Sequence, residues 1–215
     1  GNRYSGNSEY NNTAYGVDLG LDWETIERIS GELNLNVNQN LARFNPGDAP
    51  TVLKRNMEQT GDAQAVFRVG GVTALTFEGI LGHRQLRYSA REFNYRELDQ
   101  DSVSLGVRYK PRDALALGVA LRHSKAEYPR FQETAPDVFL ADRVKRDDLD
   151  LSTDWKVSGA STVVGRISLS RSRHSEATSQ DFSGATGSLG WYWSPTGKIK
   201  LNTTLSRETG VESSF

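Results

Sequence analysis

The chain has 215 residues, which is enough for one large all-β domain or two smaller domains. Its 26 basic and 27 acidic side chains give a net charge of -1, so it lacks the basic field that non-specific binding of nucleic acid requires. It has no cysteine, which excludes disulfides and thiolate metal sites, and no run of about 18 apolar residues that would cross a membrane as a helix.

The first predicted strand begins at Tyr15. Apolar side chains occupy every second position, with glycine or aspartate between them, and consecutive strand side chains point to opposite faces. A return strand has the same period, and its polar face is rich in asparagine. The apolar positions of this pair are Tyr15, Val17, Leu19, Leu21 and Trp23, then Leu33, Leu35 and Val37.

The same alternation continues through eight further segments, which gives ten strands in all. Each segment has one apolar face and one face of glycine, serine, asparagine or charged residues. A membrane β-barrel needs an apolar residue only at every second position, so the mean hydropathy of -0.58 is compatible with one. The eight segments are 62–69, 75–84, 103–109, 115–122, 148–155, 166–170, 188–193 and 199–206.

The links between strands alternate in length. Short links rich in turn-forming residues are expected at 24–30, 70–73, 110–113, 158–161 and 194–197. Long polar links are expected near 45–60, 89–99, 129–145 and 173–180. Outer-membrane barrels have this asymmetry, with short periplasmic turns and longer outer loops. The pattern predicts an all-β, antiparallel transmembrane β-barrel in which residues 1–215 form a single domain.

An aromatic residue closes the strand that enters each short turn. The spacing is roughly forty residues, the length of one strand, turn, strand and loop unit. On the apolar face, such residues form a girdle at the level of the lipid headgroups. The predicted girdle consists of Trp23, Phe67, Tyr109, Trp155 and Trp193.

A soluble β-sandwich is the alternative fold, in which the alternation marks a packed core. Ten hairpin-linked strands with loops long on one side only favour the barrel. Near the long loops Phe44, Tyr88 and Tyr128 fall on the polar register, which predicts bulges or strands that extend beyond the membrane. The chain has no leader at its start, so we expect a signal peptide to be already removed or to lie outside this stretch.

Several motifs resemble the EpsL-like outer-membrane proteins of bacterial exopolysaccharide operons, in the β-barrel porin-2 group. They are RNMEQT at 55–60, LGVRYKP at 105–111, AEYPRF at 126–131, DFSG at 181–184 and GSLGW at 187–191. The resemblance implies a Gram-negative outer membrane and a role in exporting an exopolysaccharide. The implied partners are outer-membrane lipid, the polymer and periplasmic export components. Members of this family are longer, so we expect further strands and take ten as a lower bound.

The polar face would line the lumen of this barrel. Basic residues dominate its middle four strands, whereas aspartates gather on the first and seventh, which predicts a segregated field. One hypothesis is a path for a polar or anionic sugar polymer, and the other is that the charges pair across strands. The candidate residues are Arg68, Arg84, Arg108, Arg122, Arg166 and Lys200, with Asp18, Asp150 and Asp154.

Signals for an enzyme are few. His83, His123 and His174 occur singly, without metal-ligand spacing, and Gly184, Gly187 and Gly190 are not followed by a helix. A third hypothesis is a barrel enzyme that acts on lipid or polysaccharide, with a Ser-His-Asp site assembled from separate strands. A general diffusion porin is the second hypothesis, after export. We predict no catalytic residue, no metal and no cofactor.

Overall fold

The computed structural model describes residues 13–25, 28–42, 56–70 and 74–207. Within them, ten antiparallel strands form one sheet, and the strands follow one another in sequence order. Their bounds are β1 Tyr15–Thr25, β2 Ile29–Leu41, β3 Met57–Val69, β4 Leu75–Tyr88, β5 Leu98–Arg112, β6 Leu115–Ala135, β7 Val138–Ser158, β8 Ser161–His174, β9 Phe182–Thr196 and β10 Ile199–Arg207.

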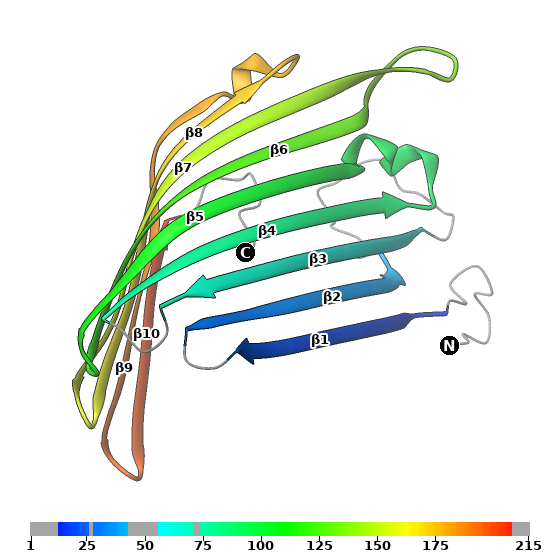
Figure 1. Cartoon of the computed structure of the whole chain (residues 1–215). Coiled ribbons are helices and arrows are strands. Elements are labelled where there is room, and N and C mark those ends of the chain that lie inside the picture. The colour runs from blue at the N-terminus through cyan, green and yellow to red at the C-terminus, as the bar shows by residue number, and fades with distance from the viewer. Residues whose placement is uncertain (1–12, 26–27, 43–55, 71–73, 208–215) are drawn as a thin grey trace.

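The sheet is strongly curved, and β9 and β10 come to lie behind β3 and β4 in the view of Figure 1. Each strand pairs with its neighbour in the chain. The first and last strands, β1 and β10, pair on one side only, with β2 and β9, so the described sheet is not closed. The predicted all-β, antiparallel, barrel-like architecture and the count of ten strands are therefore confirmed.

The two faces of the sheet differ in composition and in exposure. Leu105 is 68% exposed and Leu121 is 65% exposed, whereas Asp148 and Ser170 on the alternate register are only 3% and 4% exposed. Side chains on the concave face of a curved sheet converge, so the low exposure identifies the concave face, called here the inner face. The apolar residues lie on the convex outer face. A sandwich would bury those apolar residues against a second sheet, and the described residues form one sheet only.

The longest hairpin corrects one prediction. Residues 129–145, expected to be a loop, continue β6 and β7, each 21 residues long, up to a turn at Pro136 and Asp137. Asp137 has a positive φ of 60°, and the Glu133 carboxylate accepts a hydrogen bond from its backbone N–H at 3.2 Å. The register also shifts between Tyr128 and Gln132. Apolar residues in this part of the hairpin, such as Val138, Phe139 and Leu140, follow one another without a period of two, so it lacks the alternation that reveals the other strands.

The other long links are shorter than predicted. Residues 89–99 contain the 3-10 helix η2 (Arg91–Arg96), and residues 173–180 contain η3 (Thr178–Gln180) after β8 has ended at His174. In the link predicted at 45–60, residues 45–55 and the neighbouring Phe44 lie outside the described residues, and β3 begins at Met57. No described helix is long and apolar enough to cross a membrane.

The predicted aromatic residues all lie within three positions of a strand end beside a short turn. Phe67, Tyr109, Trp155 and Trp193 are between 38% and 47% exposed. The ring of Trp23 lies across Gly31, its partner on β2, and reaches Phe67 on β3 at a centroid distance of 5.8 Å. These residues thus form a row of rings on the outer face, in which Trp23 is half-buried, and their place at the lipid headgroups stays a prediction.

Gly31 allows this contact, because a Cβ at Gly31 would collide with the Trp23 ring. We expect Gly31→Val to displace the indole and to lower the free energy of unfolding by about 1–3 kcal/mol. Tryptophan fluorescence of the folded protein in detergent and its urea denaturation would measure both effects. Gly61→Val is the matched control, because a Cβ at Gly61 has no atom within 4 Å. Equal losses in the two variants would contradict the packing role.

Candidate functional site on the inner face

The inner face of β2, β3 and β4 carries a charge cluster centred on Arg68. Its guanidinium forms ion pairs with Glu32 on β2 and with Glu78 on β4, the latter at 2.7 Å. The cross-strand register brings Arg68 directly opposite Glu78. On the same face, the Arg84 guanidinium lies 3.6 Å from the Asp62 carboxylate.

A second and more buried cluster joins β6, β7 and β8. The Arg122 guanidinium lies 3.2 Å from Asp148 and 3.4 Å from Asp150. Arg146 contributes a second guanidinium to Asp148 at 2.8 Å, and Arg166 reaches Asp150 at 3.1 Å. The Asp148 side chain is 1% exposed and that of Arg122 is 8% exposed. Two carboxylates and three guanidiniums are therefore paired with a net charge of +1, and only the Arg166 side chain, at 34%, is more than 13% exposed.

The remaining candidates are more exposed. Arg108 lies 3.9 Å from Asp154, Asp18 accepts a hydrogen bond from Asn36, and Lys200 is exposed on β10. The predicted segregated field is wrong, because acidic and basic residues alternate at ion-pair distance. The register accounts for this: a strand rich in aspartate, β7, lies between two strands that carry Arg122 and Arg166.

A pocket of about 640 Å³ opens on the inner face at the end where the long links lie. Aromatic side chains from β4, η2 and β6 form part of its wall. Charged and amide groups from β5, β7, β8 and η3 complete it. The residues that carry its chemistry are Tyr88, Tyr95, Tyr128 and Phe131, with Arg96, Gln100, Asp142, Arg146, His174 and Gln180.

The 3-10 helix η2 is held against this wall by its aromatic residues. Phe93 is 9% exposed, and its ring lies 5.9 Å from that of Tyr88. The Arg96 guanidinium lies over the rings of Tyr95 and Phe93, at 5.5 Å and 5.6 Å. Phe93 packs the link onto the sheet, whereas the ring of Tyr95 remains 43% exposed beside the pocket. An exposed aromatic ring with an adjacent guanidinium suits a polar ring-shaped ligand.

The sequence placed Tyr88 and Tyr128 on the polar register, which is the pocket side, but it did not indicate Arg146 and Asp142. Both were placed in or beside the expected loop at 129–145, where no register could be assigned. The available signal was the parity of β7: Asp142, Val144, Arg146 and Asp148 alternate as buried residues with exposed ones.

Asp142, on β7, binds the start of the link between β8 and β9 beside the pocket. Its carboxylate accepts hydrogen bonds from the Glu176 backbone N–H at 2.9 Å and the Ser175 hydroxyl at 3.2 Å, and lies 2.8 Å from His174 Nδ1. Burial raises the pKa of Asp142, but these hydrogen bonds outweigh it and hold the pKa below the usual 3.8. His174 Nε2 is buried and has no hydrogen-bond partner among the described residues.

The lowered pKa of Asp142 predicts that the hydrogen bonds between its carboxylate and this link weaken in acid. A carboxyl group with a lower pKa in the folded state stabilises folding above pH 3.8, and the contribution is lost as the pH falls through the folded-state pKa. We expect hydrogen exchange of residues 174–181 to accelerate in that acidic range. In the Asp142→Asn variant, the backbone amides of residues 174–181 should exchange quickly at every pH tested. Exchange in the unmodified protein that does not respond to acid would contradict this role.

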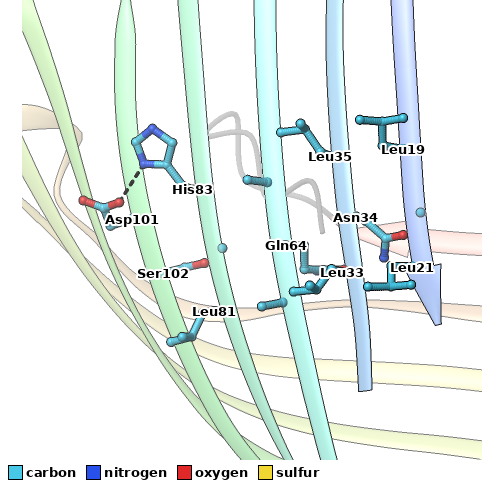
Figure 2. Close-up of a pocket in the computed structure, with 14 residues that line it drawn as sticks. Leu19, Leu21, Leu33, Asn34, Leu35, Gln64, Leu81, His83, Asp101 and Ser102 are labelled. Atoms are coloured by element: carbon cyan, nitrogen blue, oxygen red, sulfur yellow. Dashed lines mark hydrogen bonds and ion pairs between the residues drawn. The ribbon is translucent and has the colours of Figure 1, made fainter. Parts of the chain in front are cut away.

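The outer face has a hollow of similar size, about 640 Å³, across β1 to β5 (Figure 2). It forms where the small side chains of Ala63 and Ala65 on β3 lie between leucines of the neighbouring strands. His83 and Asp101 interact at its rim, with 2.8 Å between Nδ1 and Oδ1 (Figure 2). The one hydroxyl in its lining belongs to Ser102, on the inner-face register. The hollow is suited to an acyl chain.

No protein-family model matches the sequence, and no curated protein matches it. Among the described residues, no group of three or more histidine, cysteine or acidic side chains is placed to hold a metal ion. The features that bear on function are therefore the two faces of the sheet and the inner pocket.

Proposed function

We propose that this chain forms part of the wall of an outer-membrane β-barrel that exports an exopolysaccharide from a Gram-negative bacterium. The observation that carries the proposal is the contrast between the two faces: exposed apolar residues cover the outer face, and ion pairs and hydrogen-bonding groups cover the inner face. A barrel wall between lipid and an aqueous lumen needs this contrast.

The height of the apolar surface supports a membrane location. On β7 the outer-face residues from Leu149 to Val157 are apolar except Thr153, and Asp147 follows beyond Leu149. Nine strand residues extend about 30 Å at roughly 3.3 Å per residue, which a tilt of about 40° reduces to a height of roughly 23 Å, and the apolar band of outer-membrane barrels is about 25 Å tall. Exposed rings of Trp155 and Trp193 lie at the short-turn end of this surface, where Trp155 is the cross-strand partner of Leu115.

The free edges of β1 and β10 fit a larger barrel. Backbone N–H and C=O groups cannot remain unpaired in the hydrocarbon of a membrane, so a sheet that spans it has to close. We therefore expect further strands to pair with β1 and β10 in the assembled barrel. This agrees with the greater length of the proteins that the chain resembles.

The inner pocket supports a sugar polymer as the cargo. Aromatic rings such as Tyr95 offer flat faces to pyranose rings, and Gln100 and Gln180 offer donors and acceptors to hydroxyl groups. Arg96 would attract the carboxylates of an acidic polysaccharide. The resemblance to exopolysaccharide operon proteins favours the same class of cargo.

Deletion of the gene in its host tests this proposal. We expect the polymer to accumulate in the periplasm and to disappear from the culture medium, and the intact gene supplied in trans should restore export. Complementation with a Tyr95→Ala, Arg96→Gln double variant should restore the barrel but not normal export. Full export from a clean deletion strain would refute the proposal.

The pairing of the inner-face charges favours a second candidate, a general diffusion porin. Arg122 forms ion pairs with Asp148 and Asp150, so this part of the inner face carries both signs of charge and would not select a polymer by its charge. The full protein in a planar lipid bilayer separates the two functions. A large and unselective ionic conductance would indicate the porin, whereas a low conductance that added acidic polysaccharide blocks would indicate the exporter.

A further inference from the structure

Three cations line up across neighbouring strands on the outer face, just beyond the apolar surface. Lys125 on β6 lies directly opposite Lys145 on β7, and Lys145 lies opposite Arg173 on β8. All three are exposed. We call them the cationic row.

The cationic row has a fixed position relative to the apolar surface. On β6, β7 and β8 the last apolar residues of the outer face are Leu121, Leu149 and Leu169, which are also cross-strand partners. The next outer-face positions are His123, Asp147 and Arg171, and the cationic row follows two residues further along each strand. Two strand residues span about 7 Å, so the row begins roughly 13 Å beyond the last leucines.

One carboxylate faces the row directly: Asp101 on β5 is the cross-strand partner of Lys125, and it lies 2.8 Å from His83. Nearby, Asp147 lies 2.6 Å from His123 and Glu127 lies 3.4 Å from Arg143. Among the described residues, no carboxylate lies within the 4.0 Å ion-pair distance of Lys125, Lys145 or Arg173. The row is thus left with an excess of positive charge.

Like charges directly opposite one another destabilise a sheet, because cross-strand Cβ atoms are only about 5 Å apart. An external anion that bridges the three cations would remove this repulsion. We infer that the cationic row binds anionic phosphate groups of lipid headgroups in the leaflet at the long-link end of the barrel. This inference rests on the proposed membrane-spanning function.

The position of the row favours lipid phosphate over other anions. It lies on the outer face, which would contact lipid, at a height just above the acyl chains. At the opposite limit of the apolar surface, β7 and the neighbouring β9 carry exposed aromatic rings, Trp155 and Trp193. The two limits therefore differ in chemistry, and basic side chains next to a membrane attract anionic headgroups.

The test compares two lipids that differ only in the phosphate. The full protein, folded in an uncharged detergent, is titrated with dihexanoyl phosphatidic acid and with dihexanoylglycerol, and bound lipid is counted by native mass spectrometry. We expect binding of the phosphatidic acid only. The K125Q/K145Q/R173Q variant should bind it about 100-fold more weakly, which corresponds to roughly a fivefold loss for each cation.

The K110Q/K156Q/K198Q variant is the matched control, since it removes the same charge from exposed positions near the short turns. It should bind phosphatidic acid as the unmodified protein does. Equal binding by both triple variants would overturn the inference, and so would inorganic phosphate that binds the row as tightly as the lipid. Heat-modifiable migration and partition into detergent are recorded in parallel. A protein that fails these two criteria refutes the membrane barrel itself, whereas a folded barrel that ignores phosphatidic acid refutes only the lipid site.

Discussion

Asp148→Ala is expected to lower the free energy of unfolding by about 3–5 kcal/mol, one of the largest effects of any single substitution in this chain. The Asp148 carboxylate is 1% exposed and lies between the guanidiniums of Arg122 and Arg146, at 3.2 Å and 2.8 Å. Its removal leaves buried positive charge without its main partner. Urea denaturation of the protein in detergent, followed by tryptophan fluorescence, measures the loss.

The neighbouring residue provides the control. Asp147 points to the outer face, its side chain is 71% exposed, and its partner is His123. Exposed ion pairs contribute little, so we expect Asp147→Ala to change the stability by less than about 1 kcal/mol. Similar losses for the two adjacent aspartates would contradict the assignment of the two faces.

Val119→Arg is expected to cost about 2–4 kcal/mol or to prevent insertion into lipid vesicles. Val119 is 51% exposed on the outer face, between Val107 and Leu151 on the neighbouring strands, and so in the middle of the apolar surface. A guanidinium there would lie in hydrocarbon if the outer face contacts lipid. Folding yield in vesicles, read from heat-modifiable migration, is the measurement.

Val157→Arg shows how the cost of arginine depends on its depth in the membrane. Val157 is 47% exposed, like Val119, but lies at the end of β7 beside a short turn. Near the membrane interface the cost of arginine falls to about 0–1 kcal/mol. In a soluble protein, both exposed valines would tolerate arginine to within about 0.5 kcal/mol. A negligible effect at both positions would therefore exclude the membrane barrel.

The parts of the fold that the sequence predicted are those where the two faces have opposite chemistry. Between Leu115 and Leu121 each apolar residue of β6 alternates with a small or polar one, so the period of two is visible without a structure. The aromatic residues were predicted for the same reason, because Trp155 and Trp193 fall on the apolar register close to turn-forming residues. All ten strands contain such a stretch.

The rest of the long hairpin could not be predicted in this way. Around Arg130 and Glu133, β6 has one large apolar residue, Phe131, so no apolar alternation distinguishes this segment from a loop. The pocket was missed for a related reason, since it needs Asp142 and Arg146 of β7, together with the folded-back helix η2. Ion pairs such as that of Arg122 with Asp148 depend on the register between β6 and β7, and the residue pattern within one strand does not determine that register.

The strict two-residue period of the strands has a consequence for how this protein diverges. A substitution that keeps a position apolar, or keeps it polar, leaves both faces intact, so residue identity in the strands is free to drift. A one-residue insertion in the middle of β5 would instead exchange the faces of every residue beyond it. Relatives should therefore share strand lengths and alternation long after their residues have ceased to align.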